Sequence, residues 1–306
     1  MVRIVEPIGN EADANERLNW QMQVLRSMVA HDDRTGTPDI ARPGSELAED
    51  DRTTAPFHTS HLVHYALNVA SDALRTTLIL MDDSAGIRVP IIGLYPLLRT
   101  VIEGSALATW LVAPPDRSER VKRTLETRLS DVLHDDKAVI VAATIEPSDG
   151  ARERSEKSKT LRGNARQIRL QKRRLREHAA RVGVPLDLSG RPGFGPMLEA
   201  IAPVIGMSVS EVRGVWHFVS GLTHPSLSRA IRMAEVELKG PRLDDGSTLA
   251  TMSANLTTVN MAIDAALLGY KTALEVVGHR GGREDVPWAD TALPVPPAFR
   301  RVWNDR

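Results

Sequence analysis

Residues 151–182 read ARERSEKSKTLRGNARQIRLQKRRLREHAARV, and this stretch decides the fold class. Apolar residues recur there at alternating steps of four and three, interrupted only by Lys172: Leu161, Ala165, Ile168, Leu175, Ala179 and Val182. A seven-residue repeat of this kind is typical of a narrow coiled-coil seam. The stretch 116–145 carries a similar pattern, and Pro147 to Gly150 separates the two. The sequence therefore predicts a long antiparallel helical hairpin, inserted over 116–182, of which a part projects from the body.

Working outward from this hairpin, most of the chain shows the apolar spacing of helices. Helices are expected over 15–30, 59–81, from Pro90 or Pro96 to 112, 194–205, from Ser208 or Ser210 to 222, 226–238 and 247–277. Residues 31–57 are rich in Asp, Thr, Pro and Gly, which predicts a loop or lid. Residues 279–306 read as a C-terminal tail. The fold class expected is all-α, a single helical domain over 1–306.

The amino-acid composition excludes several classes of site and of protein. The chain has 306 residues with 39 basic and 39 acidic side chains, and it has no cysteine. Disulfides, thiolate zinc sites and a cysteine nucleophile are therefore excluded. No apolar run is long enough to span a membrane and no signal peptide is visible, so no membrane association and a cytoplasmic location are expected.

The first candidate site lies on the predicted helix that ends near 112. This helix is apolar on nearly every face, yet it carries Arg99 and Glu103. Residues four apart lie on one side of a helix, so the two side chains can pair. Because an isolated buried charge is costly, the pair is expected either to lock the structure or to line a polar pocket.

The second candidate site lies in RGVWHFVSGLTHPS, residues 213–226. His217, Ser220 and His224 fall on one face of the expected helix, where a histidine can act as a base or as a pH switch. A core histidine with a purely structural role is the alternative. Together with Arg99 and Glu103 these residues form the candidate catalytic set. No metal site is predicted, and the sequence leaves the cofactor open.

Charge is unevenly distributed along the chain. Residues 151–182 hold twelve Lys or Arg against three Glu, whereas the first 60 residues hold eleven acidic and six basic side chains. A basic helix on a projecting arm can follow phosphates, and Arg169, Lys172, Arg173 and Arg176 are the candidate nucleic-acid-binding residues. An acidic protein partner and a merely solvated helix face are the alternatives. The amphipathic seam also predicts a homo-oligomer, with a dimer as the simplest form.

Two segments resemble a broad group of uncharacterised bacterial all-helical proteins. The segments are LLRTVIEGSALATWLVAPPDRSERVKR (97–123) and WHFVSGLTHPS (216–226), which carry the pairs Arg99 with Glu103 and Ser220 with His224. Part of that group is similar to HEPN-type bundles, some of which are ribonucleases or toxins in defence and stress systems. The resemblance covers roughly 40 residues and implies a helical bundle more than any one activity.

The chain departs from the HEPN pattern in the position of its Arg–His pairs. In HEPN nucleases an Arg is followed by four to six residues and then by a His. Arg26 with His31, Arg52 with His58, Arg128 with His134 and Arg173 with His178 fit this spacing, but none lies in the two similar segments. Three functions are therefore expected as alternatives. They are a HEPN-like protein that binds nucleic acid or a protein partner, an enzyme or a binder of a small molecule or a metal with a polar core pocket, and a scaffold without a site.

Overall fold

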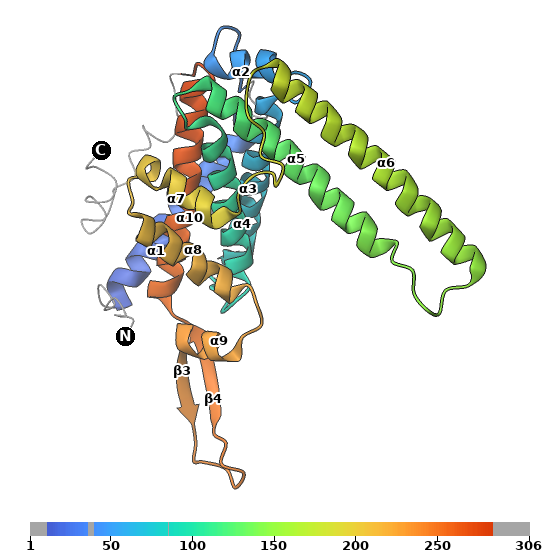
Figure 1. The fold of residues 1–306 in the computed structure, drawn as a ribbon. Coiled ribbons are helices and arrows are strands. Elements are labelled where there is room, and N and C mark those ends of the chain that lie inside the picture. The colour runs from blue at the N-terminus through green and yellow to red at the C-terminus, as the bar shows by residue number, and fades with distance from the viewer. Residues whose placement is uncertain (1–10, 36–39, 85, 284–306) are drawn as a thin grey trace.

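A computed structural model describes residues 11–35, 40–84 and 86–283. Within these ranges the chain forms ten α-helices and two small antiparallel sheets of two strands each, so the all-α prediction is confirmed. The body is a bundle of four long helices and two shorter ones that pack on it (Figure 1). The long helices are α1 (Glu11–Thr35), α3 (Thr59–Met81), α4 (Leu94–Val112) and α10 (Leu256–Arg280), and the shorter ones are α7 (Phe194–Ile205) and α8 (Val209–Leu222).

Helix α4 lies at the centre of the bundle, where α3, α7, α8 and α10 contact it. The sequence explains this place, because α4 is apolar on most of its circumference and thirteen of its nineteen residues are buried. Gly104 allows α3 to approach closely. A Cβ atom at this position would lie 2.7 Å from the carbonyl oxygen of Ala66, which no side chain would tolerate.

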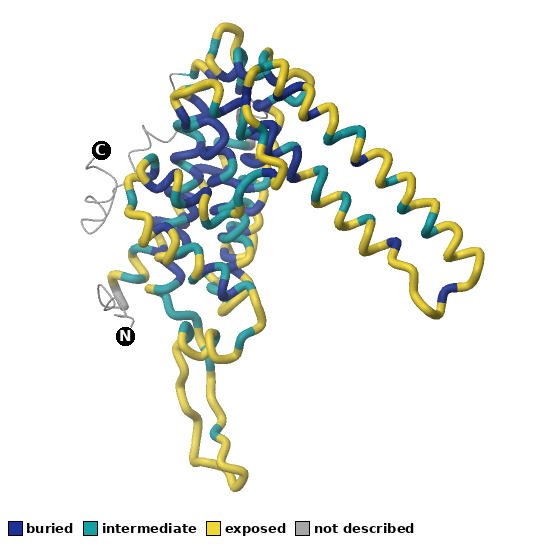
Figure 2. The backbone as a smooth tube through the Cα atoms, viewed as in Figure 1, coloured by how far each residue is buried: buried dark blue, intermediate teal, exposed yellow. Residues whose placement is uncertain are grey.

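The predicted helical hairpin is present as α5 (Arg117–Ala142) and α6 (Ala151–Arg181). Figure 1 shows the two helices running antiparallel and leaving the body as one arm. Asp116 caps the start of α5 by accepting a hydrogen bond from the backbone of Glu119. Only the base of the arm holds an apolar core, made of Val121, Leu125, Leu129, Leu175, Ala179 and Val184. The outer part of the arm is largely exposed (Figure 2).

The predicted loop or lid over 31–57 is wrong in most of its length. Helix α1 continues to Thr35, and α2 (Glu46–Thr54) forms inside the predicted loop. Ser45 caps α2 at its N-terminus, and the helix buries Leu47 and Asp50. The segment is rich in polar residues because α2 is short and offers only a narrow buried face. Residues 36–39 lie outside the described part of the chain.

The expected helices over 226–238 and 247–277 are also partly wrong. The chain forms a short helix, α9 (Leu227–Met233), and then an antiparallel hairpin of β3 (Ala234–Lys239) and β4 (Leu249–Ala254). Apolar and polar residues alternate along β3, which is the period of a strand. Helix α10 begins only at Leu256, after the cap residue Asn255.

Two other features complete the fold. A minimal hairpin of β1 (Asp82–Asp83) and β2 (Gly86–Ile87) forms the turn between α3 and α4. Of the predicted tail over 279–306, the first residues still belong to α10 and the part from 284 onward lies outside the described residues. None of the described helices combines the length and apolarity that a membrane span needs.

Candidate functional site

Arg99 and Glu103 form the predicted pair on α4. The Nε of Arg99 donates a hydrogen bond of 2.8 Å to Oε1 of Glu103. The pair is half-buried, since 30% of the Arg99 side chain and 18% of the Glu103 side chain are exposed. The predicted pairing of the two side chains is thus present, and the desolvation of these partly exposed charges is moderate.

Helix α8 brings the second similar segment against this pair. Trp216 donates its indole N–H to Oε1 of Glu103 at 3.1 Å, and Arg99 donates to the hydroxyl of Thr223 at 3.2 Å. Thr223 in turn donates to the backbone carbonyl of Ser220 at 2.7 Å. The two segments that carry the resemblance thus join α4 to α8 through one polar cluster.

The predicted histidines lie outside this cluster. His217 and His224 are exposed, and among the described residues no hydrogen bond or ion pair joins either of them to Arg99 or Glu103. Trp216 takes the place expected for His217, because neighbouring residues of a helix point about 100° apart. Ser220 contributes its carbonyl rather than its hydroxyl. The candidate catalytic set is therefore not assembled as one site.

Arg191 lies near the same cluster, in the loop after the arm. Burial lowers the pKa of its guanidinium, and the negative charges of Asp131 and Glu103 oppose this shift. The guanidinium carbon lies 5.0 Å from the ring centroid of Phe194, which is a cation–π distance. Glu103 therefore binds Arg99 and the indole of Trp216 directly and acts on Arg191 only through its charge. Such a cluster is suited to positioning α4, α8 and the base of the arm, and less suited to proton transfer.

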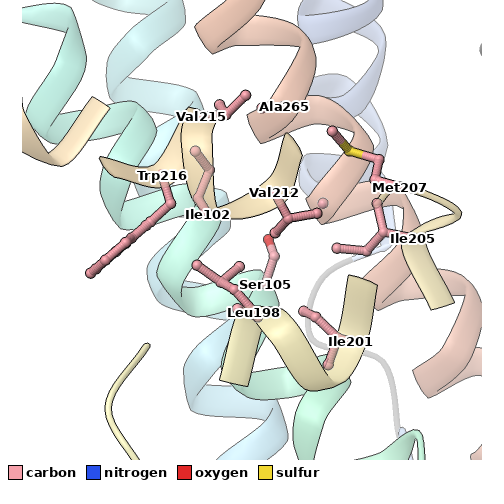
Figure 3. Close-up of a pocket in the computed structure, with 12 residues that line it drawn as sticks. Ile102, Ser105, Leu198, Ile201, Ile205, Met207, Val212, Val215, Trp216 and Ala265 are labelled. Atoms are coloured by element: carbon pink, nitrogen blue, oxygen red, sulfur yellow. The ribbon is translucent and has the colours of Figure 1, made fainter. Parts of the chain in front are cut away.

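A small cavity is lined in part by Trp216, which also belongs to this cluster (Figure 3). It lies between α4, α7, α8 and α10 and has a volume of about 30 Å³. Its walls are apolar and include neither Arg99 nor Glu103, so this cavity is a different feature from the polar core pocket that the sequence predicts. The polar exception in these walls is Ser105, which is 1% exposed and whose hydroxyl bonds no protein group in the described chain.

The basic helix α6 presents a continuous column of cations to solvent. Lys159, Arg162, Arg166, Arg169, Arg173 and Arg176 follow one another at steps of three and four and are all exposed. We call this column the outer basic face. It lies along one flank of α6, about 100° or more around the helix from the buried residues Ile168 and Leu175.

The candidate nucleic-acid-binding residues divide between two parts of α6. Arg169, Arg173 and Arg176 belong to the outer basic face, whereas Lys172 is half-buried beside the seam. Arg173 approaches Glu177 at 3.5 Å, and both side chains are about two-thirds exposed. Arg162, Arg166 and Arg169 take part in no ion pair within the described residues. These three of the six cations of the face therefore keep their full positive charge.

The histidines that follow arginines at HEPN-like spacing have structural contacts. His178, five residues after Arg173, is buried at the base of the arm, and its Nε2 lies 2.9 Å from the carbonyl oxygen of Thr53. Its burial lowers the pKa of the imidazole. Arg128 donates to the carbonyl of His58. Both contacts tie the arm to the body.

Sequence reasoning missed Thr223, Arg191 and Ser105. Trp216 and Thr223 stand inside the quoted segment, so their positions next to His217 and His224 were the available signal. Arg191 lies in a loop, and a loop residue carries no periodicity that would place it. Ser105 is one of many small residues in α4, and only the packing of four helices reveals its cavity.

The described residues contain no group of three His, Asp or Glu side chains that would hold a metal ion. A comparison of the chain with protein-family models, with curated proteins and with solved structures finds no match.

Proposed function

We propose that the protein binds nucleic acid along the outer basic face of α6, through contacts with the phosphate backbone. The observation that carries this proposal is the unbroken column of six exposed cations on a projecting arm. A column from Lys159 to Arg176 extends for about 26 Å along the helix axis. Successive cations lie about 5 Å apart along it, so several neighbouring phosphates can be contacted together.

The residue types favour a phosphate ligand. Five of the six cations are arginines, whose planar guanidinium donates two parallel hydrogen bonds to a phosphate. Helix α6 has no Phe, Tyr or Trp on which an unpaired base would stack. Contacts to the backbone without stacking are typical of duplex binding that is independent of sequence. The similarity to HEPN-type bundles, some of them ribonucleases, makes duplex RNA the first ligand to test.

The test compares two double variants of α6. One loses two cations of the outer basic face, and the other loses two cations that lie outside this face. The variant Arg166→Gln/Arg169→Gln should weaken binding of a labelled RNA duplex at least tenfold at low salt and flatten the salt dependence by about two counterions. The matched control Lys172→Gln/Arg174→Gln loses the same charge on the same helix and should weaken binding only slightly. Fluorescence anisotropy over a salt series measures both quantities.

The same binding measurement is repeated with single strands and with a DNA duplex to identify the preferred nucleic acid. The duplex should bind more tightly than its separated strands, and DNA and RNA duplexes of one sequence show whether the 2′-hydroxyl matters. Absence of binding at low salt, or equal losses in the two variants, would contradict the proposal. Binding of an acidic polypeptide with the duplex ignored would identify the arm as a protein-docking surface instead.

The cavity at Ser105 supports a second candidate function, the binding of a small apolar molecule. Its specific observation is a buried hydroxyl that faces an apolar space and bonds no protein group. A ligand with one carbonyl or hydroxyl group would satisfy Ser105 and fill the apolar walls. The volume of about 30 Å³ limits such a ligand to a few heavy atoms unless Trp216 moves.

Replacing Ser105 by alanine tests whether its hydroxyl is unpaired in an empty cavity or is bonded to a molecule that occupies the cavity. A hydroxyl without any partner costs about 1–3 kcal/mol when buried, so Ser105→Ala should leave the free energy of unfolding unchanged or raise it. Urea unfolding measures this change, with Thr100→Ala as a control on the exposed side of the same helix. A clear loss of stability in Ser105→Ala would show that the hydroxyl is satisfied by a bound molecule.

A further inference from the structure

The β3–β4 hairpin has two faces of opposite character. Its register pairs Val236 with Met252 and Leu238 with Ala250, and it places Ala234 opposite Ala254. Residues that pair directly lie on the same face of a sheet. One face of the hairpin is therefore wholly apolar. The other face carries Glu235, Glu237, Lys239, Leu249, Thr251 and Ser253.

Most of this apolar face is uncovered in the described chain, and only Ala254, at the end next to the body, packs against the bundle core. Figures 1 and 2 show the hairpin extending away from the bundle, with most of its residues exposed. Leu238 is 67% exposed and Val236 is 39% exposed. Two isolated strands are marginally stable in water, and a sheet of three or more strands with an apolar face is far more stable. The hairpin would therefore gain most from additional strands.

The two edges of the hairpin differ in their protection against pairing. Edge strands are usually guarded by charged residues, proline or a bulge. Strand β3 carries Glu235, Glu237 and Lys239 and is guarded in this way. Strand β4, with the sequence LATMSA, has no charge, no proline and no glycine. Only the edge of β4 is open to another strand.

We propose that β4 pairs antiparallel with β4 of a second copy of this chain, about a two-fold axis that passes beside Met252. In this register Thr251 lies opposite Ser253 of the partner subunit, and Ala250 lies opposite Ala254 of the partner subunit. Apolar residues thus pair with apolar residues and hydroxyl residues with hydroxyl residues. The apolar faces of the two hairpins then form one continuous apolar surface on the same side of the sheet. An alternative register, in which one strand slides by two residues and the axis passes beside Thr251, would place Leu249 opposite Ser253 of the partner subunit.

The product is a four-stranded sheet with the order β3–β4–β4–β3 and a guarded strand at each edge. The like charges of the two β3 strands are kept apart, since they lie at opposite edges. A two-fold interface of this kind uses the same patch on both subunits. Five paired residues from each copy bury less than a standard interface, so we expect a dissociation constant in the micromolar range.

Charge substitutions at the axis test the pairing. Met252→Lys and Met252→Glu each place like charges directly opposite one another, about 5 Å apart between Cβ atoms, and each variant alone should dissociate at least tenfold more readily than the parent chain. An equimolar mixture of the two variants places lysine opposite glutamate and should restore the dimer. Sedimentation velocity at tens of micromolar follows all three samples. Restoration by mixing also shows that the hairpin of each variant still folds.

The control variant is Val236→Lys, since Val236 neighbours Met252 on the same apolar face but lies on β3. It should leave the dimer intact. Equal dissociation of Val236→Lys and Met252→Lys would show that the faces adhere without strand pairing. A parent chain that stays monomeric, or a mixture of the two Met252 variants that stays dissociated, would overturn the proposal.

Discussion

Arg120 is a buried arginine of α5 that contacts α2 and the segment after α4. It is 1% exposed, and its partner Asp50 on α2 is 0% exposed. Nε and one terminal nitrogen of Arg120 bind the two carboxylate oxygens of Asp50 at 2.6 and 3.0 Å. The other terminal nitrogen donates to the carbonyls of Pro114 and Pro115, both at 2.9 Å. A fifth contact, at 3.2 Å, reaches Glu46.

These contacts have a clear physical origin. The prolines after α4 end the helix and leave its last carbonyls without intrahelical partners. Arg123 and Arg280 donate to two of those carbonyls, of Trp110 and Val112, and Arg120 donates to the carbonyls of Pro114 and Pro115 just beyond the helix. Cations at a helix C-terminus also meet the negative end of the helix dipole. Burial raises the pKa of the Asp50 carboxyl, and the contact with Arg120 opposes that rise. Loss of either partner would strand the other charge.

Substitutions at this pair should therefore be severe. Arg120→Met or Asp50→Asn should each lower the free energy of unfolding by about 3–5 kcal/mol, measured by urea denaturation. The double variant should cost less than the sum, because neither charge remains unpaired. The exposed pair of Arg213 and Glu199 serves as the control, and its loss should cost less than about 1 kcal/mol. Additive losses at Arg120 and Asp50 would show that the two side chains act independently.

Residue contacts could be predicted from the sequence only where they are local. The contact of Arg99 with Glu103 follows from their four-residue spacing. The contact of Arg120 with Asp50 spans 70 positions and two helices, and no spacing rule reaches that far. For the same reason the sequence could propose a histidine beside Glu103 but could not select Trp216. The rotation of α8 about its own axis, which packing sets, makes that selection.

Among the helices and strands, those with a long regular stripe were predicted well. The arm helices α5 and α6 repeat their apolar pattern over several turns, and their predicted bounds lie within a few residues of the observed ones. Helix α2 has nine residues and too few turns to show a period. The stretch predicted as one helix over 247–277 divides at Asn255 into the exposed strand β4 and the helix α10, although it has no charged residue from Leu249 to Ile263. Composition alone cannot separate these two environments.

The whole molecule consists of one large core with two extensions. The bundle core includes side chains from α1, α3, α4, α7, α8 and α10, whereas the arm has only its own small cluster at the base. Farther out, Ile140, Val141 and Ile145 are exposed, and the helices are bridged by single polar contacts such as that of Asn164 with Asp136. Most helical stability comes from tertiary packing, so the outer arm should be its least stable helical part.

Hydrogen exchange should reveal this order of stability. Backbone amides over 136–160 should exchange first, those of the arm base over 121–129 and 175–184 next, and those of α4 last, since local opening costs least where few apolar contacts are lost. Leu129→Ala removes a buried side chain from the base cluster at a cost of about 2–5 kcal/mol. It should speed exchange at least tenfold throughout the arm while leaving α4 unchanged.

The control for this experiment is Ile140→Ala, because Ile140 is 50% exposed near the tip of the arm and should affect exchange little. Mass spectrometry of the proteolytic peptides resolves the arm from the bundle in both variants. If Leu129→Ala accelerates exchange equally in α4 and α6, the arm and the bundle open as one cooperative unit. The outer basic face would then be as rigid as the core. If the arm alone responds, the face is carried by a helix that can open while the bundle remains folded, and binding of nucleic acid should slow exchange over 159–176 first.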